Sequence, residues 1–239
     1  MPIKLRPALR AAWRLVQAPF DFPPAVELAE ALSDWAPIRA GYQRILADLP
    51  EAERAHLRAL TRRPVDHAAL LRLPEGTLGR LYAAFLRDGG LSPTGQVDVC
   101  PAMAEAFARD WVLARFARVH DVHHALLGFG SDPYGELGLQ TFNARNFREP
   151  YAFLAVASLP ACVLRYGDPA RFLREMARGW RWGGQLPNLM SVPFEEMFEL
   201  SVDEVRARLG LDVNARLDVN APFDVNAPFD VNARLDVNR

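Results

Sequence analysis

Apolar residues recur at three- and four-residue intervals along most of the chain, with polar and charged residues between them. That spacing is typical of amphipathic helices, and no stretch before residue 210 alternates convincingly as a strand. Proline, glycine and capping residues separate the periodic segments. We predict helices at 4–20, 25–33, 38–48, 52–62, 77–87, 102–127, 136–147 and 201–210. The sequence therefore predicts an all-α fold, with a single helical domain over residues 1–210.

The first predicted helix combines an apolar stripe with a basic one. Its apolar members follow helical spacing: Leu5, Leu9, Trp13, Val16 and Phe20. Its basic members lie around them: Lys4, Arg6, Arg10 and Arg14. We interpret the segment as the first core helix with a solvated basic side. The alternative is a helix that lies on an anionic membrane surface.

The most apolar run of the domain covers residues 152–164 and contains Pro160. It is too short to span a bilayer. We interpret it as a buried core helix, and the alternative is the wall of an apolar tunnel that holds a long substrate. The segment 171–182 mixes four arginines with two tryptophans. We interpret it as a solvated face, with a membrane-facing or anion-binding rim as the alternative.

After residue 210 the pattern changes to a six-residue repeat built on Asp-Val-Asn-Ala. Apolar and polar residues alternate there as in strands, but Pro222 and Pro228 interrupt the alternation. The repeat also lacks the glycines that a calcium-binding loop would need. We therefore predict that residues 211–239 form a disordered, low-complexity tail.

Composition and charge narrow the classes of protein. The 239 residues carry a net charge of −1, so no basic excess indicates a nucleic-acid partner. The two cysteines, Cys100 and Cys162, lack the spacing of metal or redox motifs, and no segment resembles a secretory signal. We expect a reduced, cytoplasmic protein, with peripheral attachment to the inner membrane surface as an option.

Three of the five histidines fall within the short segment from His120 to His124. On a helix, His120 and His124 lie one turn apart on one face, with Asp121 close to them. His123 points to the other side, and we expect it to be a surface neighbour of the site. No catalytic residue is identified by this pattern.

Gly128 and Gly130 end the helix that carries these histidines, and Asp132-Pro133 begins the next one, which places Glu136 in its first turn. Imidazole and carboxylate groups suit divalent ions such as Zn, Fe, Mn or Co. Buried groups of this kind need a cation to share. We therefore predict a divalent metal site, with Zn as the first candidate. Its predicted ligands are His120, Asp121, His124 and Glu136.

These ligands, with eleven residues between His124 and Glu136, resemble the signature of the Coq-four family of ubiquinone biosynthesis proteins. The following segments 128–133 and 135–140 are similar to that family's linker and next helix. Upstream, the Leu73–Arg80 box with Tyr82 and Phe85 resembles another family motif. One departure is Phe194-Glu195, where the family leads us to expect Trp-Glu.

The resemblance implies a substrate and a reaction. It implies metal-dependent, oxidative removal of the carboxyl group at ring carbon 1 of a polyprenylated hydroxybenzoate. It also implies contacts with other quinone-biosynthesis proteins, and a homodimer stays open. The first alternative is a non-catalytic, lipid-binding organiser with a structural metal. The second is a phosphohydrolase, which would need His67 and Asp168 at the same site.

Overall fold

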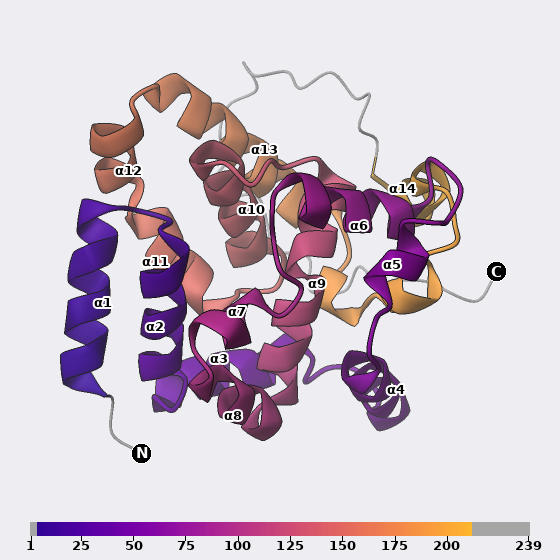
Figure 1. The fold of residues 1–239 in the computed structure, drawn as a ribbon, viewed down its shortest axis with the longest axis horizontal. Helices are drawn as coiled ribbons and strands as arrows, with labels where there is room; N and C mark the ends of the chain where they lie inside the picture. The colour runs from indigo at the N-terminus through magenta and orange to yellow at the C-terminus, as the bar shows by residue number, and fades with distance from the viewer. Residues whose placement is uncertain (1–3, 212–239) are drawn as a thin grey trace.

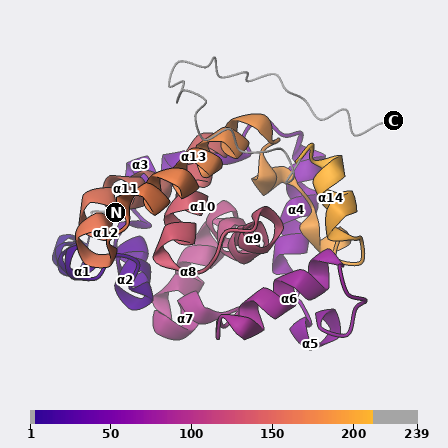
Figure 2. The ribbon, with the colours of Figure 1, turned by 90° about the horizontal axis from the view of Figure 1, so that it is seen from above.

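Helix α9 (Trp111–Leu127) runs through the middle of the computed structural model, which describes residues 4–211 (Figures 1 and 2). The helices before it are α1 (Leu5–Gln17), α2 (Phe22–Leu32), α3 (Ala36–Ile45), α4 (Glu51–Arg62), α5 (His67–Leu70), α6 (Leu78–Asp88), α7 (Gly95–Val99) and α8 (Ala102–Arg109). Those after it are α10 (Pro133–Asn146), α11 (Pro150–Ala157), α12 (Leu159–Tyr166), α13 (Pro169–Gln185), η1 (Leu189–Ser191), η2 (Phe194–Glu196) and α14 (Val202–Arg208).

The all-α prediction is confirmed, because residues 4–211 contain helices and no strand. An isolated antiparallel bridge joins Thr77 to Ser201 and brings the start of α6 to the start of α14. The tail repeat lies outside the described residues from 212 onward. Leu211 is described and buried in the main core, so the core extends one residue past the predicted domain boundary.

The prediction of one continuous helix over 102–127 is wrong, because this segment forms two helices, α8 and α9. Asp110 has extended backbone angles between α8 and α9. Its carboxylate accepts hydrogen bonds from the backbone N–H groups of Val112 and Leu113 and caps α9. An aspartate can compete in this way with the helix around it, even where glycine and proline are absent.

The apolar run 152–164 is also divided, and the interpretation as a buried core helix is wrong. It forms α11 and α12, which meet at Ser158. Phe153, Leu154 and Leu164 are exposed. The small residues Ala152 and Cys162 are fully buried instead.

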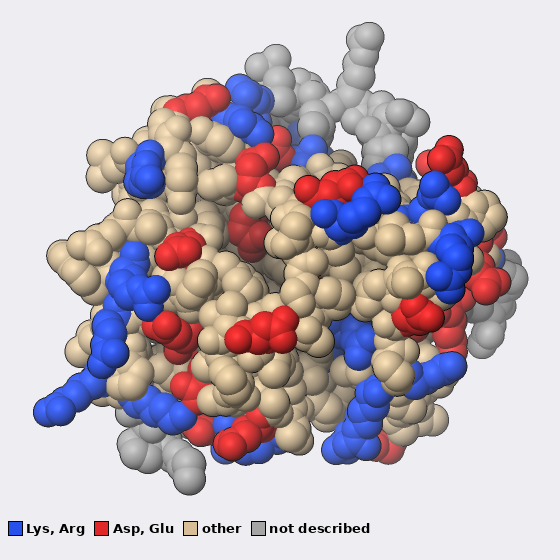
Figure 3. All heavy atoms as spheres, viewed as in Figure 1, with Lys and Arg blue, Asp and Glu red and all other residues tan. Residues whose placement is uncertain are grey.

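Helix α1 presents its large apolar side chains outward, contrary to the core interpretation. Leu5, Leu9, Trp13 and Val16 are between 60% and 63% exposed. The buried positions are Ala8 and Ala11, because α1 packs against α2 through small residues. Figure 3 shows Lys and Arg side chains along α1 beside uncharged surface. None of the described helices is both long enough and apolar enough to cross a membrane.

Helices α10 and α13 pack closely against each other, and glycines at their contact allow the two backbones to approach. A Cβ on Gly179 would lie 2.1 Å from the carbonyl oxygen of Gly138, and one on Gly183 would lie 2.9 Å from that of Phe142. The 171–182 segment therefore packs through its glycine side, and its Trp182 is buried. Of its four arginines, Arg171 and Arg174 are exposed and Arg178 and Arg181 are half-buried, so the expected solvated face covers only part of the segment.

Candidate metal centre

A close-packed turn joins the two helices that carry the predicted ligands. Helix α9 ends at Gly128, whose φ of 68° costs glycine little. The Asp132 carboxylate caps α10 by accepting hydrogen bonds from two backbone N–H groups of its first turn. A Cβ on Gly135 would lie 2.3 Å from the carbonyl oxygen of Gly130. As predicted, this turn holds Glu136 in the first turn of α10.

Three side chains converge where α9 meets α10: His120, His124 and Glu136. One ligand atom from each lies within 4.8 Å of the other two. The Nε2 atom of His124 is 2.9 Å from one Glu136 carboxylate oxygen, and Nε2 of His120 is 3.6 Å from the other. Within residues 4–211, no second group of three such side chains has this geometry.

The hydrogen bonds around these ligands fit a bound cation. Nδ1 of His124 lies 3.2 Å from the Phe129 carbonyl oxygen, to which an Nδ1–H group would donate. The Nε2 lone pair would then face the Glu136 carboxylate, and two acceptors at 2.9 Å need a proton or a cation between them. The Gln140 amide donates to the other oxygen of Glu136 at 2.7 Å. Metal-binding histidines usually place their second nitrogen on such a carbonyl.

The charges of His120 and Glu136 stabilise each other when no metal is bound. Burial opposes protonation of His120, but the Glu136 carboxylate outweighs this effect and raises the pKa of His120 to about 9. Burial also opposes ionisation of Glu136, but the two imidazoles outweigh it and hold the pKa of Glu136 well below its usual range. A divalent ion must therefore displace a proton to bind.

Asp121, the fourth predicted ligand, is not part of this group of three. It lies half-buried on α9 beside the group. Burial raises the pKa of its carboxyl, and the charges of His120 and His124 oppose that rise. The role of Asp121 as a ligand stays a prediction.

His123 is fully buried, so its expected place at the surface is wrong. Helix α9 contacts other elements on several sides, including α3, α4, α6, α8 and η1, and leaves no solvated face here. Burial lowers the pKa of His123 well below its usual range, so the ring is neutral. It packs among three phenyl rings: Phe142, Phe147 and Phe194.

Aromatic side chains cover the two imidazoles of the centre. The Phe85 ring on α6 stacks on His124, with ring centroids 5.3 Å apart and 17° between the planes. The Phe116 ring on α9 lies 5.3 Å from that of His120, at a tilted angle. Because α6 packs against α9, Phe85, which follows the Leu73–Arg80 box, reaches the metal centre.

A buried ion pair joins α9 to the segment after α13, and its basic member was not predicted from the sequence. Arg115 is fully buried, with Nη1 2.5 Å from a Glu195 carboxylate oxygen. It also donates to the carbonyl oxygens of Met190 and Val192. No local pattern distinguishes Arg115 from the other arginines of its helix. Glu195 therefore has a structural partner in Arg115, although Phe194 stands where the family leads us to expect Trp.

A second buried carboxyl, that of Glu149, was also missed. It accepts hydrogen bonds from the Tyr42 hydroxyl and the Ala152 backbone N–H group. Burial raises the pKa of Glu149 to about 7, although these hydrogen bonds oppose the rise. Part of the signal was present in the sequence, because Pro150 at a first helical position marks Glu149 as the N-cap, although glutamate is not among the usual capping residues.

The fold and the site together define an all-α protein with a two-histidine, one-carboxylate centre at a helix–turn–helix. The residues that a phosphohydrolase would need are elsewhere. His67 begins α5 and its Nε2 lies 3.2 Å from the Tyr82 hydroxyl, and Asp168 caps α13. Neither belongs to the group of three ligands.

The model of the family described as coenzyme Q (ubiquinone) biosynthesis protein Coq4 matches residues 42–214. The chain belongs to this family, which confirms the resemblance. A relative from Phaeosphaeria nodorum, named ubiquinone biosynthesis protein COQ4, mitochondrial, is 33% identical over 172 residues, which are 71% of this chain and 55% of that protein. A Danio rerio relative, named a COQ4 homolog, mitochondrial, is 31% identical over 163 residues, which are 67% of this chain and 57% of that protein.

The chain spans about half the length of the curated relatives it matches. Because those relatives are named mitochondrial, the expected cytoplasmic location stays a prediction. The fold is also that of a solved structure, a candidate ubiquinone biosynthesis protein from Nostoc punctiforme. That structure has a TM-score of 0.68 and 22% identity, and the match covers 87% of this chain and 99% of the other.

Proposed function

We propose that this protein acts in ubiquinone biosynthesis by removing the carboxyl group at ring carbon 1 of a polyprenylated hydroxybenzoate, with a divalent metal ion as cofactor. The observation that carries the proposal is the convergence of three protein ligands at the helix–turn–helix. Catalytic metal sites typically use three protein ligands and keep one position for water or substrate. Family membership supports the pathway, and the substrate class is part of the proposal.

His120, His124 and Glu136 would hold the ion, with Zn as the first candidate and Fe, Mn or Co as the others. When bound, the ion supplies a Lewis acid for negative charge on the substrate carboxylate or phenolate. Phe85 and Phe116 limit the access of water to the imidazoles. Carbon dioxide leaves while the ring keeps the bonding electrons, and a proton takes its place. In the oxidative form a hydroxyl group enters instead: one atom of molecular oxygen goes to the ring, and two electrons from a separate reductant, with protons from water, convert the other atom to water.

Metal analysis and a decarboxylation assay test this proposal. The purified protein should contain about one divalent ion per chain and should release labelled carbon dioxide from a substrate with a labelled carboxyl group. His124→Ala should lose both. His56→Ala is the matched control, because His56 is exposed on α4 and outside the centre. Equal metal content in wild type and His124→Ala would refute the assigned site.

A non-catalytic, lipid-binding organiser of other quinone-biosynthesis proteins is the second candidate. The exposed apolar side chains of α1, α11 and α12 favour it, because they could bind lipid without any chemistry at the centre. The two candidates differ in the assay above. A metal-loaded wild-type protein that binds substrate and releases no carbon dioxide, with molecular oxygen present, would favour the organiser.

The same exposed side chains lead us to propose that α1 lies on an anionic membrane surface. Its outward apolar residues could enter the interface while its arginines contact anionic lipid headgroups. Leu9→Ser/Trp13→Ser should reduce co-sedimentation with phosphatidylglycerol vesicles several-fold. Phosphatidylcholine vesicles are the control for charge. If the variant instead converts a dimer to a monomer and leaves vesicle binding unchanged, the face is a homodimer contact.

A further inference from the structure

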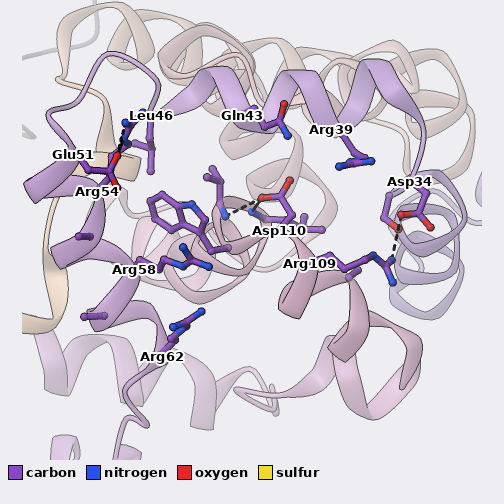
Figure 4. Close-up of a pocket in the computed structure, with 17 residues that line it drawn as sticks. Asp34, Arg39, Gln43, Leu46, Glu51, Arg54, Arg58, Arg62, Arg109 and Asp110 are labelled. Carbon is purple, nitrogen blue, oxygen red and sulfur yellow. Dashed lines mark hydrogen bonds and ion pairs between the residues drawn. The ribbon is translucent and has the colours of Figure 1, made fainter. Parts of the chain in front are cut away.

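A cleft of about 650 Å³ lies between α3, α4 and the junction of α8 with α9 (Figure 4). None of the proposed metal ligands lines it. The cleft lies at the N-terminal end of α9, and His120 is roughly 13 Å further along the helix axis. Its charged lining consists of five arginines and three carboxylates: Arg39, Arg54, Arg58, Arg62, Arg109, Asp34, Glu51 and Asp110.

The three carboxylates of the cleft are already engaged. Asp34 pairs with Arg109 at 3.4 Å, and Glu51 pairs with Arg54 at 2.5 Å. Asp110 accepts hydrogen bonds from two backbone N–H groups of α9 at 2.9 and 3.2 Å. Its charge therefore faces the positive end of the α9 dipole. These contacts use two of the five arginines.

The other three arginines, Arg39, Arg58 and Arg62, make no side-chain hydrogen bond or ion pair with any described residue. Arg58 and Arg62 lie one turn apart on the same side of α4, so their charges repel each other. Figure 4 shows that they extend from α4 toward the middle of the cleft, and that Arg39 comes from α3. Positive charges from two walls can share one anion, because guanidinium groups donate charge-assisted hydrogen bonds to several oxygens at once.

The rest of the lining is apolar. The side chain of Trp111 is partly buried in the cleft, and Leu46 and Val112 are buried beneath it. Alanines on α4 and α8 add further apolar lining. The volume falls within the range of small-molecule sites. The cleft thus combines a cationic rim with an apolar floor, which favours a ligand that has an anionic group and an apolar body.

We infer that this cleft binds a small phosphorylated organic molecule. Its phosphate dianion contacts Arg39, Arg58 and Arg62, and its apolar body lies on Trp111. A phosphate monoester carries two negative charges and three terminal oxygens, which can serve three guanidinium groups. A single carboxylate has two oxygens and one charge, so it serves fewer of them. This binding site is independent of the metal centre.

Titration calorimetry with four probes tests the ligand class, at constant ionic strength and pH 7.5. Phenyl phosphate should bind saturably and most tightly, inorganic phosphate and benzoate should each bind at least fivefold more weakly, and phenol should show no binding. If benzoate or phenol binds as tightly as phenyl phosphate, the assignment to a phosphate dianion is wrong. Absence of saturable binding by phenyl phosphate also overturns the inference.

Two variants test the residues. Arg58→Gln/Arg62→Gln should weaken phenyl phosphate binding at least tenfold. The control Arg72→Gln/Arg174→Gln removes the same charge from exposed positions outside the cleft and should change binding less than twofold. Arg39→Gln acts from the opposite wall and should also weaken binding, which keeps the test valid if the double variant fails to fold. Equal affinity in wild type and Arg39→Gln, or equal losses in the cleft and control pairs, would refute the site.

Discussion

The buried carboxyl of Glu149 should make the stability of the metal-free protein fall as the pH rises. Its pKa is about 7 in the folded protein, against an ordinary value of 4.5. Below pH 4.5 the carboxyl is protonated in both the folded and unfolded states. Between pH 4.5 and 7 only the unfolded chain releases the proton, so unfolding becomes easier. Above pH 7 the carboxyl is ionised in both states and the penalty is constant.

The size of this effect follows from the two pKa values. Each pH unit between the folded and unfolded pKa is worth about 1.4 kcal/mol. The shift of Glu149 therefore lowers the free energy of unfolding by about 3 kcal/mol between pH 4.5 and 7. Screening by solvent reduces this free-energy change only slightly, because Glu149 is fully buried. The groups that face it are the Tyr42 hydroxyl, the backbone N–H groups of Tyr151 and Ala152 and, at longer range, His120.

Urea unfolding at several pH values measures the effect on chelator-treated protein. The informative quantity is the difference in stability between wild type and Glu149→Gln, because other groups titrate in both proteins. Relative to wild type, Glu149→Gln should gain about 3 kcal/mol as the pH rises from 4.5 to 7. Glu53→Gln, at an exposed position in the first turn of α4, should show no such pH-dependent difference. A constant difference between wild type and Glu149→Gln over this range would refute the reasoning.

Three further changes test the packing. Gly179→Ala should cost about 3 kcal/mol or more in urea unfolding, because the new Cβ would lie 2.1 Å from the backbone oxygen of Gly138. Glu195→Ala should cost about 3 kcal/mol, because it leaves the charge of Arg115 buried without its partner. Truncation after Leu211 should leave the melting temperature unchanged, since the repeat offers no apolar face that matches the helical core.

Each of the two point substitutions has its own control. Gly95→Ala places a Cβ no closer than 3.4 Å to any neighbour, and it should leave stability unchanged or slightly raised. Glu196→Ala removes a half-exposed carboxylate that pairs only with an exposed histidine, and it should cost less than about 1 kcal/mol. A Gly179→Ala protein as stable as Gly95→Ala would contradict the close approach of α10 and α13. Equal effects at positions 195 and 196 would contradict the role of the buried ion pair.

The sequence by itself determined the helical class and the turn that carries the metal centre, because those features depend on local signals. Gly128 ends one helix, Asp132 caps the next, and helical spacing places His120 and His124 one turn apart on the same face of α9. These relations act within a few residues, so the chain around them need not be known. The same local geometry places Glu136 beside the two imidazoles without help from distant parts of the chain.

Only the tertiary structure decided which apolar and charged side chains are buried. His123 and Arg115 are fully buried because other elements cover α9 on several sides, whereas Leu9 is exposed because α1 packs through alanines. The helical pattern of a segment gives its apolar face, but it does not say which face a neighbour covers. Glu149 likewise owes its raised pKa to burial, which brings it to a tyrosine 107 residues away in the sequence.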